Sequence, residues 1–221
     1  MVDIHTHIIP FVDDGSKSLD DSINMIKQEI DNGVDTICCT PHHIYQRYMC
    51  SVDKIKENFN LLKEKVEELK LPVRLLLGQE IYYTHRVDII KMLQNGELLT
   101  MNNTNKVLLE FSFVREPEDL YDILYNFSIK GYKVIVAHVE RYEWITIDKV
   151  KSMKAEGAII QINSGSIVGK TTSKEKRLTK KLLKLGLVDV VASDIHSFRS
   201  STMELALNKV KDKNLFEFDI R

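Results

Sequence analysis

Strand-like and helix-like segments alternate along the whole chain, and this alternation limits the possible folds more than any other feature. Parallel strands connected by helices account for such a pattern. Seven β/α units of roughly 30 residues each predict an α/β fold, a closed or nearly closed (β/α)7 TIM-like barrel. An open, doubly wound sheet is the alternative and ranks second. The expected strands cover residues 2–7, 34–39, 73–77, 107–111, 133–137, 158–162 and 188–192.

Several helix boundaries carry their own signals. A capping box from Ser18 to Asp21 opens a helix that Gly33 is placed to end. A long amphipathic helix follows over 55–69 and is closed by Pro72. The last helix is expected at about 200–210.

Composition excludes several classes of protein. The 221 residues, 43% of them hydrophobic, suit one domain spanning 1–221. Because 31 basic residues face 32 acidic ones, the chain lacks the positive field of a general nucleic-acid binder. Cys38, Cys39 and Cys50 show no disulfide framework and indicate free thiols in a reducing cytoplasm. Without a leader or a long apolar run, we expect neither export nor membrane insertion.

Candidate metal ligands lie where the expected strands end. His5 and His7 share one face of the first strand, because side chains in a strand alternate with a period of two. In a barrel of parallel strands, the carboxyl ends of all strands meet on one rim. Residues far apart in the sequence would therefore converge there. The further candidates are His42, Glu80, Glu110, His138, Asp194 and His196.

The chemistry of this set favours a cation. Burying several carboxylates and imidazoles together without one would cost several kcal/mol per unpaired charge. Nitrogen and oxygen ligands without thiolate favour Mn²⁺, Fe²⁺ or Zn²⁺ over Ca²⁺. Asp14 is either part of an ordinary Asp-Gly turn or a further ligand. His43 and His85 are interpreted as ordinary histidines.

Two arginines are candidates for substrate contacts. Arg141 lies three residues after His138, where a barrel loop would aim it at the site, and a guanidinium pairs well with phosphate. A surface ion pair is an equally good interpretation of its position. Arg47, between two tyrosines after the second strand, is either a contact to a substrate ring or part of an exposed loop.

Two other phosphate-binding schemes fail on spacing. The segment 165–171 has three residues between its glycines, whereas a P-loop needs four, so we interpret it as a loop on the barrel rim. No arginine stands at the required distance after any cysteine, so a cysteine-based phosphatase is excluded. The basic stretch from Lys170 to Lys184 is expected to be a solvated helix face, with a docking patch for an acidic partner as the alternative.

With these residues assembled, the chain resembles the polymerase and histidinol phosphatase (PHP) superfamily. The branch it resembles most is that of the bacterial tyrosine phosphatases of capsule biosynthesis. The segments that carry the resemblance are 3–7, 13–15, 40–43, 78–83, 137–142 and 192–196.

The resemblance implies a distorted seven-stranded barrel with three divalent ions, usually manganese. His5, His7, Glu80 and Asp194 would hold the first ion, and Glu80 would bridge to the second. Glu110 and His138 would complete the second site, and Asp14, His42 and His196 would form the third. The family's phosphate-binding arginine corresponds to Arg141. In the family, a second phosphate-binding arginine usually follows the last metal-binding histidine by five or six residues, whereas Arg199 follows His196 by three.

The resemblance also implies the reaction. A hydroxide bridging the metal ions would attack phosphotyrosine, and His42 or His196 would serve as general acid. The expected substrate is the tyrosine-phosphorylated tail of a bacterial kinase that controls capsule or exopolysaccharide synthesis. Histidinol-phosphate phosphatase and a phosphodiesterase or exonuclease are the rival enzymes. The rival outside catalysis is a regulatory module with a structural metal site.

Overall fold

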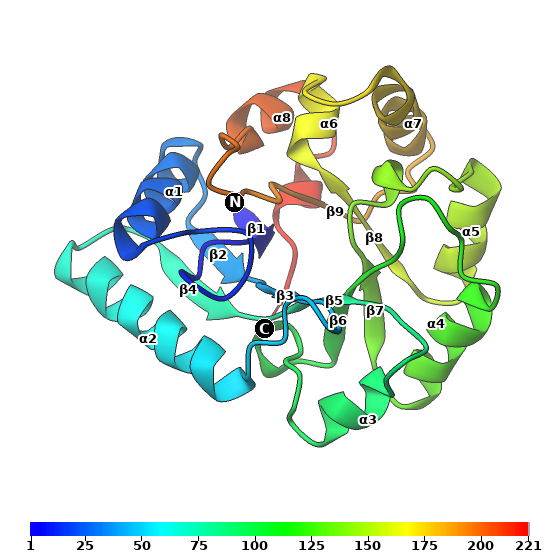
Figure 1. Ribbon diagram of the computed structural model, residues 1–221. Helices are drawn as coiled ribbons and strands as arrows, with labels where there is room; N and C mark the ends of the chain where they lie inside the picture. The colour runs from blue at the N-terminus through cyan, green and yellow to red at the C-terminus, as the bar shows by residue number, and fades with distance from the viewer. Residues whose placement is uncertain (221) are drawn as a thin grey trace.

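The computed structural model describes residues 1–220 as an α/β fold in which parallel strands curl around a central axis and helices cover the outside (Figure 1). The predicted class and the parallel order of the strands are confirmed. The strands are β1 (Val2–Thr6), β2 (Thr36–Cys39), β3 (His42–His43), β4 (Arg74–Leu77), β5 (Glu80–Tyr82), β6 (Lys106–Glu110), β7 (Lys133–Val136), β8 (Ile159–Asn163) and β9 (Val190–Ala192).

The strands belong to two sheets, with the orders β1-β2-β4 and β3-β5-β6-β7-β8-β9. The expected strands 34–39 and 73–77 are present as β2 and β4, and each is followed after a short break by a further strand, β3 or β5, that the sequence analysis did not predict. Pro41 separates β2 from β3, because proline has no N–H to donate to a sheet. Gly78 and Gln79 separate β4 from β5 in the same register.

The first strand also meets the last one. The backbone N–H of His7 donates to the carbonyl of Ile195 at 3.0 Å, and the N–H of Asp194 donates to the carbonyl of His5 at 2.9 Å. A parallel bridge between Thr6 and Ile195 accompanies these bonds. The curl is thereby drawn together at the end where the predicted ligands lie.

The helices pack on the outer face of the sheets (Figure 1). Ser18 caps α1 by accepting a hydrogen bond from the N–H of Asp21, which confirms the predicted start of this helix, while the carboxylate of Asp21 accepts the N–H of Lys17 and not that of Ser18 as in a full capping box. The last helix is shorter than predicted. The helices are α1 (Leu19–Asp31), α2 (Val52–Glu68), α3 (Ile89–Gln94), α4 (Leu120–Ile129), α5 (Ile147–Ala155), α6 (Ser164–Val168), α7 (Ser173–Lys184) and α8 (Met203–Lys209).

Two apolar clusters form the core. The larger one lies between the sheets and the helices and includes Ile26, Leu62 and Phe127. The smaller one gathers residues from successive strands, among them Ile4 and Leu108, and Ile220 packs into it. No helix within residues 1–220 is both long enough and apolar enough to cross a membrane.

Candidate metal centre

The structure brings all nine predicted metal ligands together at one end of the curl. All but Asp14 lie at or shortly after the strand ends that the sequence indicated, and Asp14 lies in the loop before α1. Their ligand atoms form four overlapping groups, in each of which the atoms lie within 4.8 Å of one another. The nine are His5, His7, Asp14, His42, Glu80, Glu110, His138, Asp194 and His196.

Hydrogen bonds place a hydrogen on Nδ1 of His5, which lies in β1, and on Nδ1 of His7, which follows β1. The amide oxygen of Gln161 accepts the backbone N–H of His138, so His5 Nδ1, 3.2 Å away, must be the donor to it. The carboxylate of Asp13 likewise accepts from His7 Nδ1 at 2.8 Å. The two Nε2 atoms, which face each other at 3.2 Å, are then the ring atoms left to bind a cation. A cation shared by the two lone pairs would make this contact favourable.

Glu80 stands at the centre of the cluster. Its Oε2 lies 3.2 Å from Nε2 of both His5 and His7 and 2.9 Å from Nδ1 of His42. Its Oε1 lies 3.1 Å from Nε2 of His138. Burial alone would raise the pKa of Glu80, but the surrounding imidazoles hold it well below the ordinary value. Glu80 therefore remains a carboxylate despite being fully buried.

Several buried polar atoms in the cluster form no hydrogen bond of acceptable geometry, although they lie close to one another. They include Oε2 of Glu80, Nδ1 of His42 and Oδ1 of Asp14. Burial raises the pKa of Glu110 to about 9, and the charge on Glu80 adds to this effect. Unpaired acceptors and a displaced carboxyl pKa are costly without a cation, so the donor set suits divalent metal ions.

A third group lies toward the opening of the site. His196 Nδ1 donates to the backbone carbonyl of Asp194 at 3.1 Å, which leaves its Nε2 3.6 Å from Oδ1 of Asp14. His42 Nε2 lies at the same distance from that oxygen. A Cβ atom on Gly15 would lie 2.0 Å from the carbonyl oxygen of His7, so only glycine allows the loop to hold Asp14 here.

Three residues that hold the predicted ligands were missed by the sequence analysis. Asp13 fixes His7 and also accepts the backbone N–H of His42 at 2.9 Å. The side-chain amide nitrogen of Gln161 donates a hydrogen bond to Oδ1 of Asn163 at 2.8 Å, and the side-chain nitrogen of Asn163 donates to Oδ2 of Asp194 at 2.9 Å. The sequence did contain a signal for two of them. Gln161 and Asn163 are amide residues two positions apart at the end of the expected strand 158–162, the one expected strand without a predicted ligand.

Comparison with known proteins decides the family. The family described as "Capsular polysaccharide synthesis, CpsB/CapC" matches residues 1–215. The chain belongs to this CpsB/CapC family. It is 34% identical to the putative tyrosine-protein phosphatase CapC of Staphylococcus aureus, over 98% of this chain and 86% of that one. Against the tyrosine-protein phosphatase CpsB of Streptococcus agalactiae serotype V, identity is 35% over 89% and 83% of the two chains.

Solved structures agree with this assignment. A structure described under YwqE from Bacillus subtilis and CpsB from Streptococcus pneumoniae, metal-dependent tyrosine phosphatases, superposes with a TM-score of 0.88 and 32% identity. The superposition covers 94% of this chain and 85% of that one. A histidinol phosphate phosphatase from Lactococcus lactis reaches a TM-score of 0.59 at 14% identity, over 95% and 91% of the chains, and shares the fold.

In this CpsB/CapC family member, a pocket of about 460 Å³ opens onto the cluster. Arg47, Arg141 and Arg199 all line it. Nη1 of Arg141 and Nη1 of Arg199 each donate to Oδ2 of Asp194 at 3.0 Å. The short spacing of Arg199 from His196 therefore does not keep it out of the pocket. Aromatic walls complete the pocket, and the sequence analysis did not single them out: Tyr82, Phe113 and Phe198.

Two residues of the cluster have unusual backbone geometry. His138 and Asp194 have φ angles of 30° and 52°, in the left-handed region that residues other than glycine rarely adopt. At each of these residues the backbone turns after a strand, and the turn directs the end of the strand into the site. Such strain persists only where the surrounding structure holds it, and it is concentrated at functional sites.

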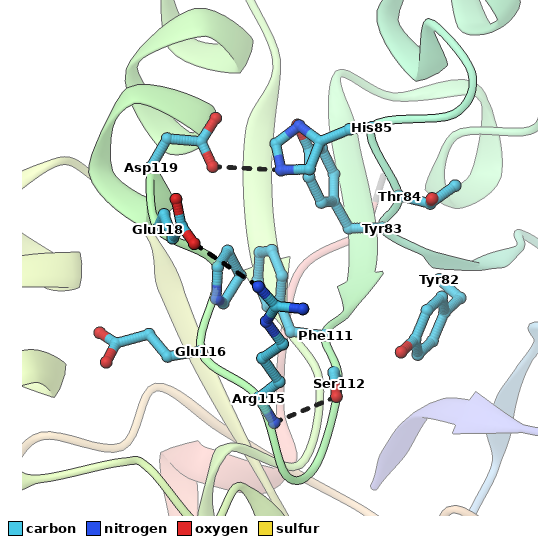
Figure 2. Close-up of a pocket in the computed structure, with 11 residues that line it drawn as sticks. Tyr82, Tyr83, Thr84, His85, Phe111, Ser112, Arg115, Glu116, Glu118 and Asp119 are labelled. Atoms are coloured by element: carbon cyan, nitrogen blue, oxygen red, sulfur yellow. Dashed lines mark hydrogen bonds and ion pairs between the residues drawn. The ribbon is translucent and has the colours of Figure 1, made fainter.

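The remaining histidines and the cysteines lie outside the cluster. His43 is buried beside it without joining any ligand group within residues 1–220. His85 lines a separate hollow of about 650 Å³, which shares only Tyr82 with the metal pocket (Figure 2). Burial raises the pKa of Cys39 to about 12 and that of Cys38 well above the ordinary value, so neither is a reactive thiolate.

Proposed function

We propose that the protein is a metal-dependent protein-tyrosine phosphatase that acts in capsule or exopolysaccharide synthesis. The observation that carries the proposal is the convergence of four imidazoles on the buried carboxylate of Glu80, at the floor of a pocket with arginine and aromatic walls. The names of the relatives support the same activity.

We assign three divalent ions to the cluster, most readily Mn²⁺, with Fe²⁺ or Zn²⁺ as alternatives. The first would be held by His5, His7, Glu80 and Asp194, and the second by Glu80, Glu110 and His138. The third would be held by Asp14, His42 and His196. When bound, the ions would supply an activated water molecule as nucleophile and positive charge for the phosphate oxygens.

The arginines would orient the phosphate. Arg141 stacks its guanidinium over Phe113, with Cζ 4.4 Å from the ring centre, and burial by the site leaves it only partly exposed. Arg199 is more exposed and donates to the same oxygen of Asp194. Two guanidiniums at this point could form charge-assisted hydrogen bonds to phosphate oxygens and stabilise the transition state.

The aromatic walls would accept the tyrosine ring. Tyr82 lines the pocket from the end of β5, and Phe113 and Phe198 line it from the segments after β6 and β9. Arg47 also lines it, with Cζ 5.0 Å from the ring centre of Tyr48. The leaving phenolate has a pKa near about 10, so it makes modest demands on a general acid. His42 or His196, both at the opening, would supply the proton through water.

Two finer assignments complete the proposal. The interrupted strands β2/β3 and β4/β5, together with the link from β1 to the segment after β9, suggest that the two sheets act as one distorted seven-stranded barrel. The physiological substrate would be the phosphorylated tail of a bacterial tyrosine kinase, as the family's place in capsular polysaccharide synthesis suggests.

One experiment tests the function. The full chain, purified with no residues before Met1, is assayed for bound metal and for hydrolysis of a phosphotyrosine peptide, histidinol phosphate and single-stranded DNA. We expect hydrolysis of the peptide alone, its loss after chelation and its return with Mn²⁺. His138→Ala should abolish turnover while circular dichroism stays unchanged. Full activity after chelation would refute the proposal.

A further inference from the structure

A second hollow adjoins the metal pocket on the side of the loops that follow β8 and β9. It has a volume of about 390 Å³ and shares Arg141, Phe198 and Arg199 with the metal pocket. The two guanidiniums thus form the wall between the hollows. The segment 165–171 lines it from the other side. This segment was predicted to be a rim loop, but it begins with the short helix α6.

The lining of this hollow is cationic and polar. Arg141, Lys170 and Arg199 supply its cations, and Glu175 supplies the one carboxylate among its lining residues, while Asp194, outside the lining, pairs with both arginines at 3.0 Å. Within residues 1–220, the exposed ammonium of Lys170 forms no salt bridge and no side-chain hydrogen bond. Most of the other lining groups are small or polar, and several are hydroxyls.

The one carboxylate is already engaged. Glu175 lies in the first turn of α7, and the hydroxyl groups of Thr171 and Thr172 both donate to its oxygens. In return, Thr172 accepts the backbone N–H of Glu175 at 3.2 Å, so the pair forms a helix cap. With both arginines paired to Asp194 and Glu175 held by two hydroxyls, Lys170 is the lining cation that remains available to an external anion.

The hollow on the opposite side of the metal pocket has the opposite charge. Glu116, Glu118 and Asp119 line it with a single arginine, Arg115 (Figure 2). An anionic side chain next to the metal pocket would therefore be attracted toward the cationic hollow and repelled from the acidic one. Such complementarity acts on specificity and association rate more than on raw affinity.

We propose that the cationic hollow is a subsite for an anionic side chain close in sequence to the phosphotyrosine. This inference rests on the proposed phosphatase activity and adds the substrate class. Because an extended chain advances by roughly 3.3–3.6 Å per residue, a hollow that shares its wall with the metal pocket is within reach of the nearest neighbours of the phosphotyrosine. A glutamate carboxylate and a second phosphate have the charge it selects.

The test compares matched peptides. One set carries Glu on either side of the phosphotyrosine, a second carries Gln there, and a third carries a second phosphotyrosine. At low salt we expect kcat/KM for the Glu peptide to exceed that for the Gln peptide by about tenfold, mainly through KM. The preference should shrink in high salt. The third set shows whether a phosphate is preferred to a carboxylate.

Charge reversal locates the effect. Lys170→Glu should lower kcat/KM for the Glu peptide by about tenfold and leave the Gln peptide and phenyl phosphate within twofold. Lys180→Glu is the matched control, because it makes the same change on α7 but lines a different hollow. Equal losses in the two variants, or no difference between Glu and Gln peptides, would overturn the subsite.

A binding measurement separates the two proposals. Fluorescence anisotropy with non-hydrolysable phosphonate versions of the Glu and Gln peptides reports the subsite without turnover. If no substrate is hydrolysed but the Glu peptide binds about tenfold more tightly and Lys170→Glu removes the difference, the phosphatase activity is refuted and the anionic subsite stands. Equal binding of the two peptides refutes the subsite, whatever the activity.

Discussion

The metal centre and the hollow of Figure 2 contain the same kinds of residue in opposite circumstances. In the hollow, His85 pairs with Asp119 at 3.3 Å, and their side chains are 63% and 41% exposed. In the centre, His5 approaches Glu80 at 3.2 Å with both side chains 0% exposed. The distance between an imidazole and a carboxylate therefore does not by itself identify a functional site, and the burial and the number of partners must also be known.

The number of partners distinguishes the two regions. Within residues 1–220, each charged group of the hollow has at most one ion-pair partner inside the hollow, and water can satisfy the rest. Glu80 faces four imidazoles, and Asp194 faces two arginines and three imidazoles. Groups crowded in this way without water require a compensating charge, which makes the centre a site and leaves the hollow a surface feature.

Removing the central carboxylate should have the largest effect. Glu80→Gln takes away the charge that several imidazoles face, so we expect loss of bound metal and a fall in phosphotyrosine hydrolysis of at least about 1,000-fold. Metal analysis and steady-state kinetics measure both. Glu118→Gln in the exposed hollow is the matched control and should change neither. An active, metal-loaded Glu80→Gln protein would contradict the assignment.

Asp13 provides a smaller, graded test. Oδ2 of Asp13 accepts from both His7 Nδ1 and the backbone N–H of His42, and its Oδ1 accepts the backbone N–H of Gly15, whereas an amide can accept at only one of these two positions. The amide also lacks the negative charge that holds the Nδ1 hydrogen of His7, so the ring would be fixed less firmly with Nε2 toward the metal site. We expect Asp13→Asn to weaken metal affinity and activity by about 10- to 100-fold, and added Mn²⁺ to restore part of kcat. Asp119→Asn is the control, and an Asp13→Asn protein with unchanged metal affinity would rule out this role.

Metal affinity should rise with pH. Burial raises the pKa of Glu110 to about 9. Burial alone would lower the pKa of His7, but the nearby carboxylates of Asp13 and Glu80 outweigh it and raise the pKa of His7. Both groups hold a proton at neutral pH in the metal-free protein, and a bound ion must displace it. Affinity should therefore increase by up to about tenfold per pH unit for each proton displaced between pH 6 and 9. Calorimetry in two buffers counts the protons, and a flat profile would contradict the expectation.

The smallest effect is expected in the hollow. His85→Ala breaks an exposed ion pair, so phosphotyrosine hydrolysis should stay within twofold and the free energy of unfolding should change by less than about 0.5 kcal/mol. Kinetics and denaturant titration measure the two quantities. A large loss of peptide hydrolysis would instead show that the hollow takes part in substrate binding, and the contrast between the regions would fail.

Sequence reasoning could find the cluster of candidate ligands because metal chemistry uses few residue types and parallel strands place their ends together. His138 and Asp194 stood out at the ends of apolar runs. Gln161 and Asn163 did not, because amides in a strand have many roles and only the geometry shows which hydrogen bonds they make. The position of Arg199 depended on the turn of the backbone after Asp194, which spacing alone cannot specify.

The backbone link between the first strand and the segment after the last one has a consequence for biosynthesis. Ribosomes produce His5 and His7 long before Asp194, and at roughly 5–20 residues per second the interval is on the order of ten seconds or more. During that time the two imidazoles lack their partner from the segment after β9. Loading with the ion that we propose for these residues would therefore be completed only after Asp194 has been synthesised.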